Sequence, residues 1–112
     1  MAKVEIVRVL FDEINKTFKK ESIIVFQYLK SLKDSPKKGK FVGSVGGIIV
    51  KELKYKTFRF YFITDGFKLK CISKTDLTEL LMKFVRMSKK QNQQETIDEI
   101  KFILRTIGSS GF

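Results

Sequence analysis

The sequence predicts an α+β domain, with an N-terminal strand and a helical hairpin packed on a small antiparallel sheet and followed by a C-terminal helix. Two observations support this class. Lys56–Ile63 alternates between phenylalanine and more polar residues, as a strand with one buried face does. The flanking segments instead carry apolar residues at helical spacing. With 112 residues, 43% of them hydrophobic, residues 1–112 are expected to form a single domain.

The N-terminal third predicts one strand and one or two helices. Lys3–Leu10 is rich in Val and Ile and is expected to be the strand. Phe11–Lys33 has helical spacing, with a predicted break near Lys20-Glu21-Ser22. Asp34-Ser35-Pro36 ends the pattern, because proline cannot continue a helix. The predicted inward stripe of this segment consists of Ile14, Phe18, Ile24, Tyr28 and Leu32.

Three strands are expected in succession in the centre of the chain, at about Gly47–Leu53, Lys56–Ile63 and Phe67–Ser73. Before them, the basic segment Lys37–Lys40 predicts a loop, and the glycines after it a second turn. Asp65-Gly66 is typical of a two-residue hairpin turn. Such a turn would place Tyr61 opposite Lys70 and Ile63 opposite Lys68. One face would then be apolar, and the other would carry arginine, tyrosine and lysine.

Two helical patterns complete the sequence. The first begins at Asp76, and its apolar stripe consists of Leu77, Leu80, Leu81, Phe84 and Val85. Thr96–Ile107 is expected to be the last helix, with Gly108 as its stop signal. The lone Cys71 falls on the predicted apolar face and is interpreted as a packing residue.

Charge is concentrated in the centre of the chain. The formal net charge is +11, and residues 35–74 contain ten basic and two acidic residues. Such a field attracts polyanions, although a basic surface can also serve solubility alone. The absence of histidine excludes imidazole bases and His-containing metal sites, and one cysteine cannot form a structural zinc site. We therefore expect no metal site and no cofactor. No apolar run approaches the roughly 20 residues that span a bilayer, so no membrane span is expected. A lone cysteine cannot form an internal disulfide, which favours a reducing, cytoplasmic location.

Three short motifs resemble the RelE/ParE superfamily of toxins from type II toxin–antitoxin systems. Glu52-Leu53-Lys54 is similar to a Glu-Leu-Arg strand of that family, and Phe58-Arg59-Phe60-Tyr61 to a Tyr-Arg-x-x-Tyr strand. Phe84–Lys90 is similar to a Phe-x-Lys-Lys stretch that precedes the last helix. The resemblance covers roughly residues 3–107. It departs at Thr75–Met82, where an inserted helical segment is expected, and at Glu95-Thr96, where a proline is frequent.

The resemblance implies a metal-independent endoribonuclease that cuts mRNA in the ribosome through attack of a ribose 2′-hydroxyl on the adjacent phosphate. Arg59 would clamp the phosphate oxygens and Arg86 would stabilise the developing charge or face the leaving group. Lys54 would act as a base if neighbouring cations lower its pKa, and Tyr61 would stack on a base or bind the ribose. The predicted RNA-binding residues are Lys51, Lys68, Lys70, Lys89 and Lys90. The expected partners are an acidic antitoxin and the ribosome with its mRNA.

Structural alternatives compete with these roles. A turn at Tyr55–Lys56 would place Glu52 opposite Arg59 in a simple cross-strand ion pair. Tyr61 could be a half-buried strand residue, and residues 86–90 the solvated end of a helix. Two other functions also fit: a ParE-like toxin that inhibits DNA gyrase without cutting, and a nucleic-acid-binding accessory protein of a phage or mobile element.

Overall fold

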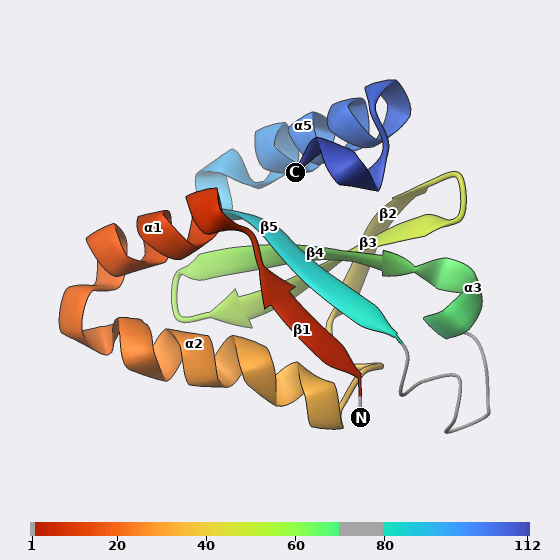
Figure 1. Cartoon of the computed structure of the whole chain (residues 1–112). Helices are drawn as coiled ribbons and strands as arrows, with labels where there is room; N and C mark the ends of the chain where they lie inside the picture. The colour runs from red at the N-terminus through yellow and green to blue at the C-terminus, as the bar shows by residue number, and fades with distance from the viewer. Residues whose placement is uncertain (1, 70–79) are drawn as a thin grey trace.

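In the computed structural model, which describes residues 2–69 and 80–112, helices lie on both faces of a twisted sheet (Figure 1). The strands are β1 (Lys3–Ile6), β2 (Lys40–Val45), β3 (Ile48–Tyr55), β4 (Phe58–Asp65) and β5 (Leu81–Lys89). The helices are α1 (Arg8–Phe18), α2 (Ser22–Lys30), α3 (Gly66–Leu69) and α5 (Gln93–Thr106). The predicted α+β class is therefore confirmed.

The described residues form a five-stranded mixed sheet with the order β1-β5-β4-β3-β2. The pairs β2–β3, β3–β4 and β4–β5 are antiparallel, whereas β1 runs parallel to β5. The sequence predicted an antiparallel sheet, and the parallel pair β1–β5 corrects that prediction. The strand β4 lies in the middle of the order, so both of its faces are available for packing against helices.

The phenylalanines of β4 form the core beneath the helical hairpin α1–α2. Phe60 and Phe62 are fully buried. The ring of Phe18, at the end of α1, lies 4.9 Å from the ring of Phe58 and 6.1 Å from that of Phe60. The Phe62 ring lies 4.9 Å from that of Phe84 on β5. The predicted apolar face of this strand is confirmed.

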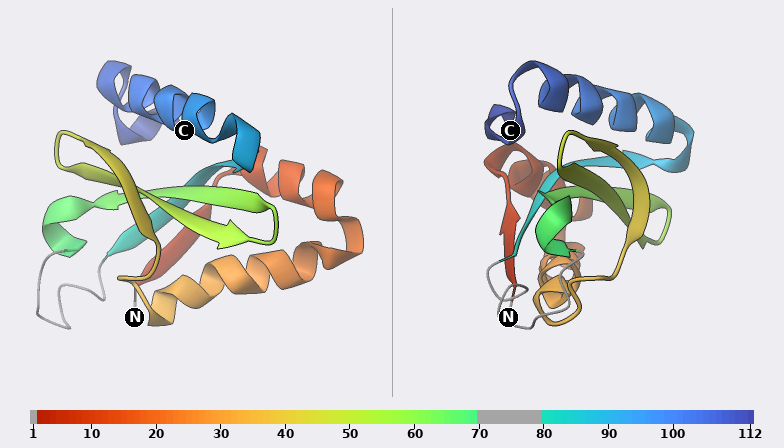
Figure 2. Two further views of the ribbon diagram at one scale, coloured as in Figure 1. Left: turned by 180° about the vertical axis from the view of Figure 1, so that it is seen from behind. Right: turned by 90° about the vertical axis from the view of Figure 1, so that its right-hand side faces the viewer.

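The opposite face of the sheet is covered in part by α5, which contacts β2 and β5 (Figure 2). Tyr61 points to this face and has no exposed surface. Ile97, Ile100 and Leu104 of α5 are buried and belong to the same core cluster. The face expected to be an open basic surface is therefore partly a second packing layer.

The helical hairpin begins earlier than predicted. The strand β1 ends at Ile6, because the backbone of Val7 donates a hydrogen bond to the Phe84 carbonyl (3.1 Å) and then accepts the first hydrogen bond of α1. The predicted break is confirmed as a turn of 3₁₀ helix at Lys19–Glu21. Within α2, Ile24 is 56% exposed, and Val25 and Leu29 are buried in its place.

The predicted hairpin turn at Asp65-Gly66 is wrong, because a short helix begins there. The Asp65 carboxylate accepts hydrogen bonds from the backbone amides of Phe67 (2.9 Å) and Lys68 (3.2 Å), which starts the short helix α3 where a strand was expected. Gly66 is needed for close approach, since a Cβ atom there would lie 2.6 Å from the Ile49 side chain. The rest of the predicted strand, including Lys70 and Cys71, lies outside the described residues.

The predicted helix after Asp76 is wrong over its described part, where β5 takes its place. Tyr61 consequently pairs with Arg86, and Phe62 with Phe84. Burial of Leu80, Met82 and Phe84 follows the alternation of a strand. Leu80, Leu81, Phe84 and Val85 also fit helical spacing, and pairing with the flanking strands β1 and β4 selects the strand. The sequence interpretation also missed β2, which was assigned to a loop and a turn.

The last helix is confirmed, since α5 spans Gln93–Thr106 against the predicted Thr96–Ile107. The strands β3 and β4 lie within two residues of their predicted bounds. Within the two described segments, no helix is long and apolar enough to cross a membrane.

Replacing a phenylalanine by alanine should lower stability much more at a buried position of the core than at an exposed position. We expect Phe60→Ala to lower the free energy of unfolding by about 3–5 kcal/mol, because it leaves a cavity between β4 and the hairpin. The matched control is Phe102→Ala, whose side chain on α5 is 65% exposed and whose loss should change stability by about 0.5 kcal/mol or less. Urea unfolding of both variants measures the difference, and equal losses would contradict this core.

Candidate nucleic-acid interface

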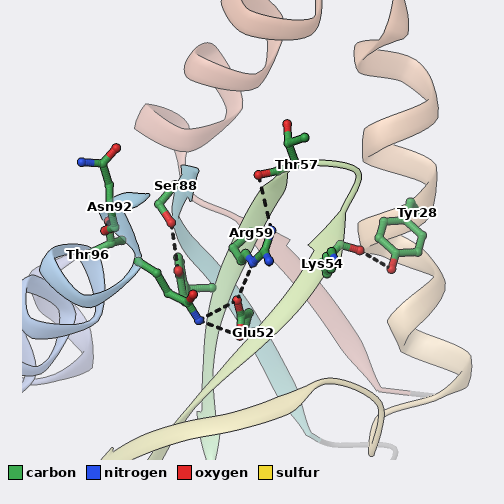
Figure 3. A network of polar contacts seen from close by, with 10 residues as sticks. Tyr28, Glu52, Lys54, Thr57, Arg59, Ser88, Asn92 and Thr96 are labelled. Atoms are coloured by element: carbon green, nitrogen blue, oxygen red, sulfur yellow. Dashed lines mark hydrogen bonds and ion pairs between the residues drawn. The ribbon is translucent and has the colours of Figure 1, made fainter. Parts of the chain in front are cut away.

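An open groove of about 480 Å³ lies at the end of β3 where β2 no longer accompanies it. Its lining comes from β3 and β4, from α2, from the segment that leads into β2, and from the start of α5. Figure 3 shows polar contacts at this place, where Tyr28 points toward Lys54 and Glu52 lies beside Arg59. The lining residues are Tyr28, Lys38, Gly39, Lys40, Glu52, Leu53, Lys54, Arg59, Lys90 and Gln93. Residues far apart in the sequence thus meet in one depression.

The groove is strongly cationic. Its lining includes five basic side chains, Lys38, Lys40, Lys54, Arg59 and Lys90, and one carboxylate, Glu52. All four of the lysines are exposed. Cations that share a concave surface raise the local positive potential, and the low-dielectric walls of a groove concentrate it. The geometry therefore suits an extended anion such as a phosphodiester chain.

The single carboxylate of the groove is already engaged. An Oε1 atom of Glu52 lies 3.2 Å from Nε of Arg59, and the Gln93 amide donates hydrogen bonds to both Glu52 oxygens (3.0 and 3.2 Å). Only 6% of the Glu52 side chain and 12% of the Arg59 side chain are exposed. This network joins β3, β4 and the first turn of α5 into one unit.

The Glu52–Arg59 pair confirms the alternative interpretation of Arg59, with a different register. The turn lies at Lys56-Thr57, so Arg59 is opposite Lys54 and reaches Glu52 diagonally. The pair and a hydrogen bond from Nη1 to the Thr57 carbonyl (3.4 Å) use two of the five N–H groups of the guanidinium. Within residues 2–69 and 80–112, its other three N–H groups have no partner, so Arg59 retains donors for a phosphate.

Two of the predicted catalytic residues lie outside the groove. The buried Tyr61 hydroxyl is hydrogen bonded to Oγ of Ser88 (2.9 Å), and burial raises the pKa of the Tyr61 phenol. Arg86 donates to Glu99 of α5 (2.8 Å) and to the Val85 carbonyl (2.7 Å), and it lies 5.2 Å from the Phe112 ring. The structure therefore brings Arg59 and Lys54 together, but not Arg86 and Tyr61 with them.

The five predicted RNA-binding lysines are dispersed. Lys90 lines the groove, whereas Lys89 lies on the hairpin side with its Nζ atom 5.9 Å from the Phe58 ring. Lys68 lines a separate depression beside α3, and Lys70 lies outside the described residues. Lys51 is buried on the hairpin side, where it donates to the Lys37 carbonyl (2.9 Å), and burial lowers its pKa. The single predicted basic face thus does not form.

Sequence reasoning missed four residues of the groove: Tyr28, Lys38, Lys40 and Gln93. The basic loop Lys37–Lys40 was noticed, but nothing in its composition indicates which strand it approaches. The Tyr28 side chain is half-buried at the rim, with its hydroxyl hydrogen bonded to the Lys54 carbonyl (2.8 Å). Among the residues that the structure describes, no three carboxylate, histidine or cysteine side chains gather closely enough to hold a metal ion.

Comparison of this chain with protein-family models, with curated proteins and with solved structures finds no match. The interface is therefore defined by its own geometry and charge.

From the burial of Lys51 we predict how the free energy of unfolding depends on pH. A lysine with a lowered pKa in the folded state binds fewer protons than in the unfolded state, at pH values between that lowered pKa and the ordinary 10.5. Its contribution to the free energy of unfolding therefore rises with pH in this interval. We expect Lys51→Met to remove that rise in urea unfolding measured up to about pH 10, where tyrosines begin to ionise. Lys54→Met, an exposed lysine on the same strand, is the control. Identical pH slopes for the two variants would contradict the burial of Lys51.

Proposed function

We propose that this protein is a toxin of a type II toxin–antitoxin system, and that it cuts mRNA on the ribosome after binding the RNA strand in the cationic groove. The observation that supports this most is the convergence of five cations from separate segments in one open groove, with the only carboxylate of the described lining held in an ion pair. Resemblance of the β3 and β4 motifs to the RelE/ParE superfamily supplies the reaction.

Recognition would begin with the phosphates. Exposed Lys38, Lys40 and Lys90 surround the groove and would neutralise successive phosphates of a strand lying in it. Contacts of this kind position a nucleic acid without reading its sequence. The choice of cleavage site would then come from the ribosome, which presents the mRNA.

Cleavage would take place at the floor of the groove. Arg59 and Lys54 are direct cross-strand partners, so both side chains leave the same face of the sheet and can reach one phosphate. As the 2′-oxygen attacks, negative charge grows on the non-bridging oxygens. Two adjacent cations therefore stabilise the transition state more than they stabilise the ground state. The O2′–P bond forms as the P–O5′ bond breaks, and the proton of the 2′-hydroxyl passes through solvent water to the departing 5′-oxygen. The catalytic roles of Arg86 and Tyr61 stay predictions from the resemblance.

The same groove would be the target of the antitoxin. An acidic segment of a partner protein could neutralise the five cations and exclude RNA. Coupled folding of such a segment is a known way to cover a large charged surface. Inhibition and activity would then depend on one surface.

A second function is favoured by the state of the predicted catalytic residues. Arg59 is paired with Glu52, Arg86 is paired with Glu99, and Tyr61 is buried. Such an arrangement also suits a ParE-like toxin that binds DNA gyrase and cuts nothing, because binding needs a fixed charged surface and no reactive group.

Induced expression in a bacterium tests the proposal. We expect the wild-type chain to stop protein synthesis before DNA synthesis and to cut mRNA in a purified translation reaction. The double variant Lys54→Ala/Arg59→Ala should cut mRNA at least about 100-fold more slowly, because it loses the positive charge at the reacting phosphate. The matched control is Lys16→Ala/Arg105→Ala, which removes the same two charges from exposed helical positions and should remain active.

Three outcomes would count against the proposal. Earlier arrest of DNA synthesis would indicate the gyrase-inhibiting function. Harmless expression of the folded wild-type chain would indicate a non-toxic accessory protein. Equal activity of the two double variants would show that the reaction does not take place in the groove.

A further inference from the structure

The groove has one aromatic side chain among its described lining residues, and that residue is Tyr28. Its hydroxyl donates to the Lys54 carbonyl (2.8 Å), and its ring centroid lies 5.6 Å from that of Tyr55. Both contacts join α2 to β3, so the ring is held in place from two directions. A ring fixed in this way loses little conformational entropy when a ligand stacks on it.

An exposed cation lies against this ring. The Nζ atom of Lys38 lies 5.4 Å from the Tyr28 ring centroid, in a cation–π contact. Lys38 lines the groove with Tyr28, and its side chain is exposed. An exposed cation–π contact contributes little, so a phosphate in the groove can draw the Lys38 ammonium away from the ring.

We propose that Tyr28 and Lys38 form a nucleobase subsite at the end of the groove. An unpaired base stacks on the Tyr28 ring, and Lys38 binds the phosphate attached to that nucleotide. This inference rests on the proposed function, and it names the ligand class more closely as single-stranded nucleic acid. A base within a duplex is stacked between its neighbours and cannot lie flat on a side chain at the wall of a groove.

Other aromatic residues do not offer this platform. Tyr61, which sequence reasoning assigned to base stacking, is fully buried beneath α5. Phe41 and Phe102 are exposed, but neither lines the groove. Among the described residues, Tyr28 is the aromatic side chain that lines the groove together with its five cations.

Binding of two polyanions to the full chain tests the subsite: a short single-stranded oligouridylate and the same sugar–phosphate strand without bases. For the wild-type protein, we expect the base-containing strand to bind at least about fivefold more tightly, since stacking of one base supplies that difference. The variant Tyr28→Leu should reduce binding of oligouridylate to the level of the abasic strand and leave abasic binding nearly unchanged. Tyr28→Phe keeps the ring and should retain most of the preference.

The salt dependence of binding separates stacking from charge. Tyr28→Leu should leave the slope of log K against log salt unchanged, because no phosphate contact is lost. Lys54→Ala should lower the slope by about 0.7 for either strand. Thermal unfolding of each variant establishes that the compared proteins are folded, and the wild-type comparison of the two strands needs no variant.

The inference and the proposed function fail in different ways. Equal wild-type affinities for the two strands, or an equal loss for both in Tyr28→Leu, would overturn the nucleobase subsite and leave phosphate binding intact. Failure of the wild-type protein to bind either strand, or no effect of Lys54→Ala on either, would overturn the groove as a nucleic-acid site altogether.

Discussion

The ion pair between Glu52 and Arg59 is the contact on which the rest of the structure depends. The pair is almost fully removed from solvent, and burial of charge is unfavourable unless each partner is satisfied. Glu52 meets this condition with Arg59 and the Gln93 amide, and these residues come from β3, β4 and α5. The same pair fixes the guanidinium at the floor of the groove. Folding and the geometry of the candidate site are therefore coupled through one carboxylate.

Much of the fold followed from local patterns, and the errors have identifiable physical causes. Alternation along β4 and helical spacing along α5 depend on residues that are neighbours in the chain, so both elements were predicted. Asp65 is ambiguous because its carboxylate can cap a helix as readily as its backbone can enter a turn. The apolar residues of β5 fit both periods, and the sheet on either side of it selects the strand. Long-range pairing decides these cases and leaves no local signal.

The candidate site was only partly predictable for the same reason. Arg59 and Lys54 were found because they stand in the two short strand motifs that resemble the RelE/ParE superfamily, each directly beside a core residue. Tyr28 was assigned to the inward stripe of its helix, and its hydroxyl contact to β3 depends on how α2 docks on the sheet. Lys51 and Lys54 lie three residues apart on one strand and so point to opposite faces, which separates a buried lysine from a groove lysine. Composition indicates that the surface charge is positive, but it does not indicate where on the fold the charge gathers.

Mapping a bound strand onto the chain by NMR tests the central claim most directly. Titration of labelled protein with a short single-stranded RNA should shift the amide signals of residues that line the groove, above all Lys38–Lys40, Lys54, Arg59 and Gln93. These signals should move together with one saturating midpoint, and added salt should reverse the shifts. Shifts confined to the exposed outer face of α1 and α2, or to the depression beside α3 and Lys68, would contradict the assignment of the groove as the nucleic-acid interface.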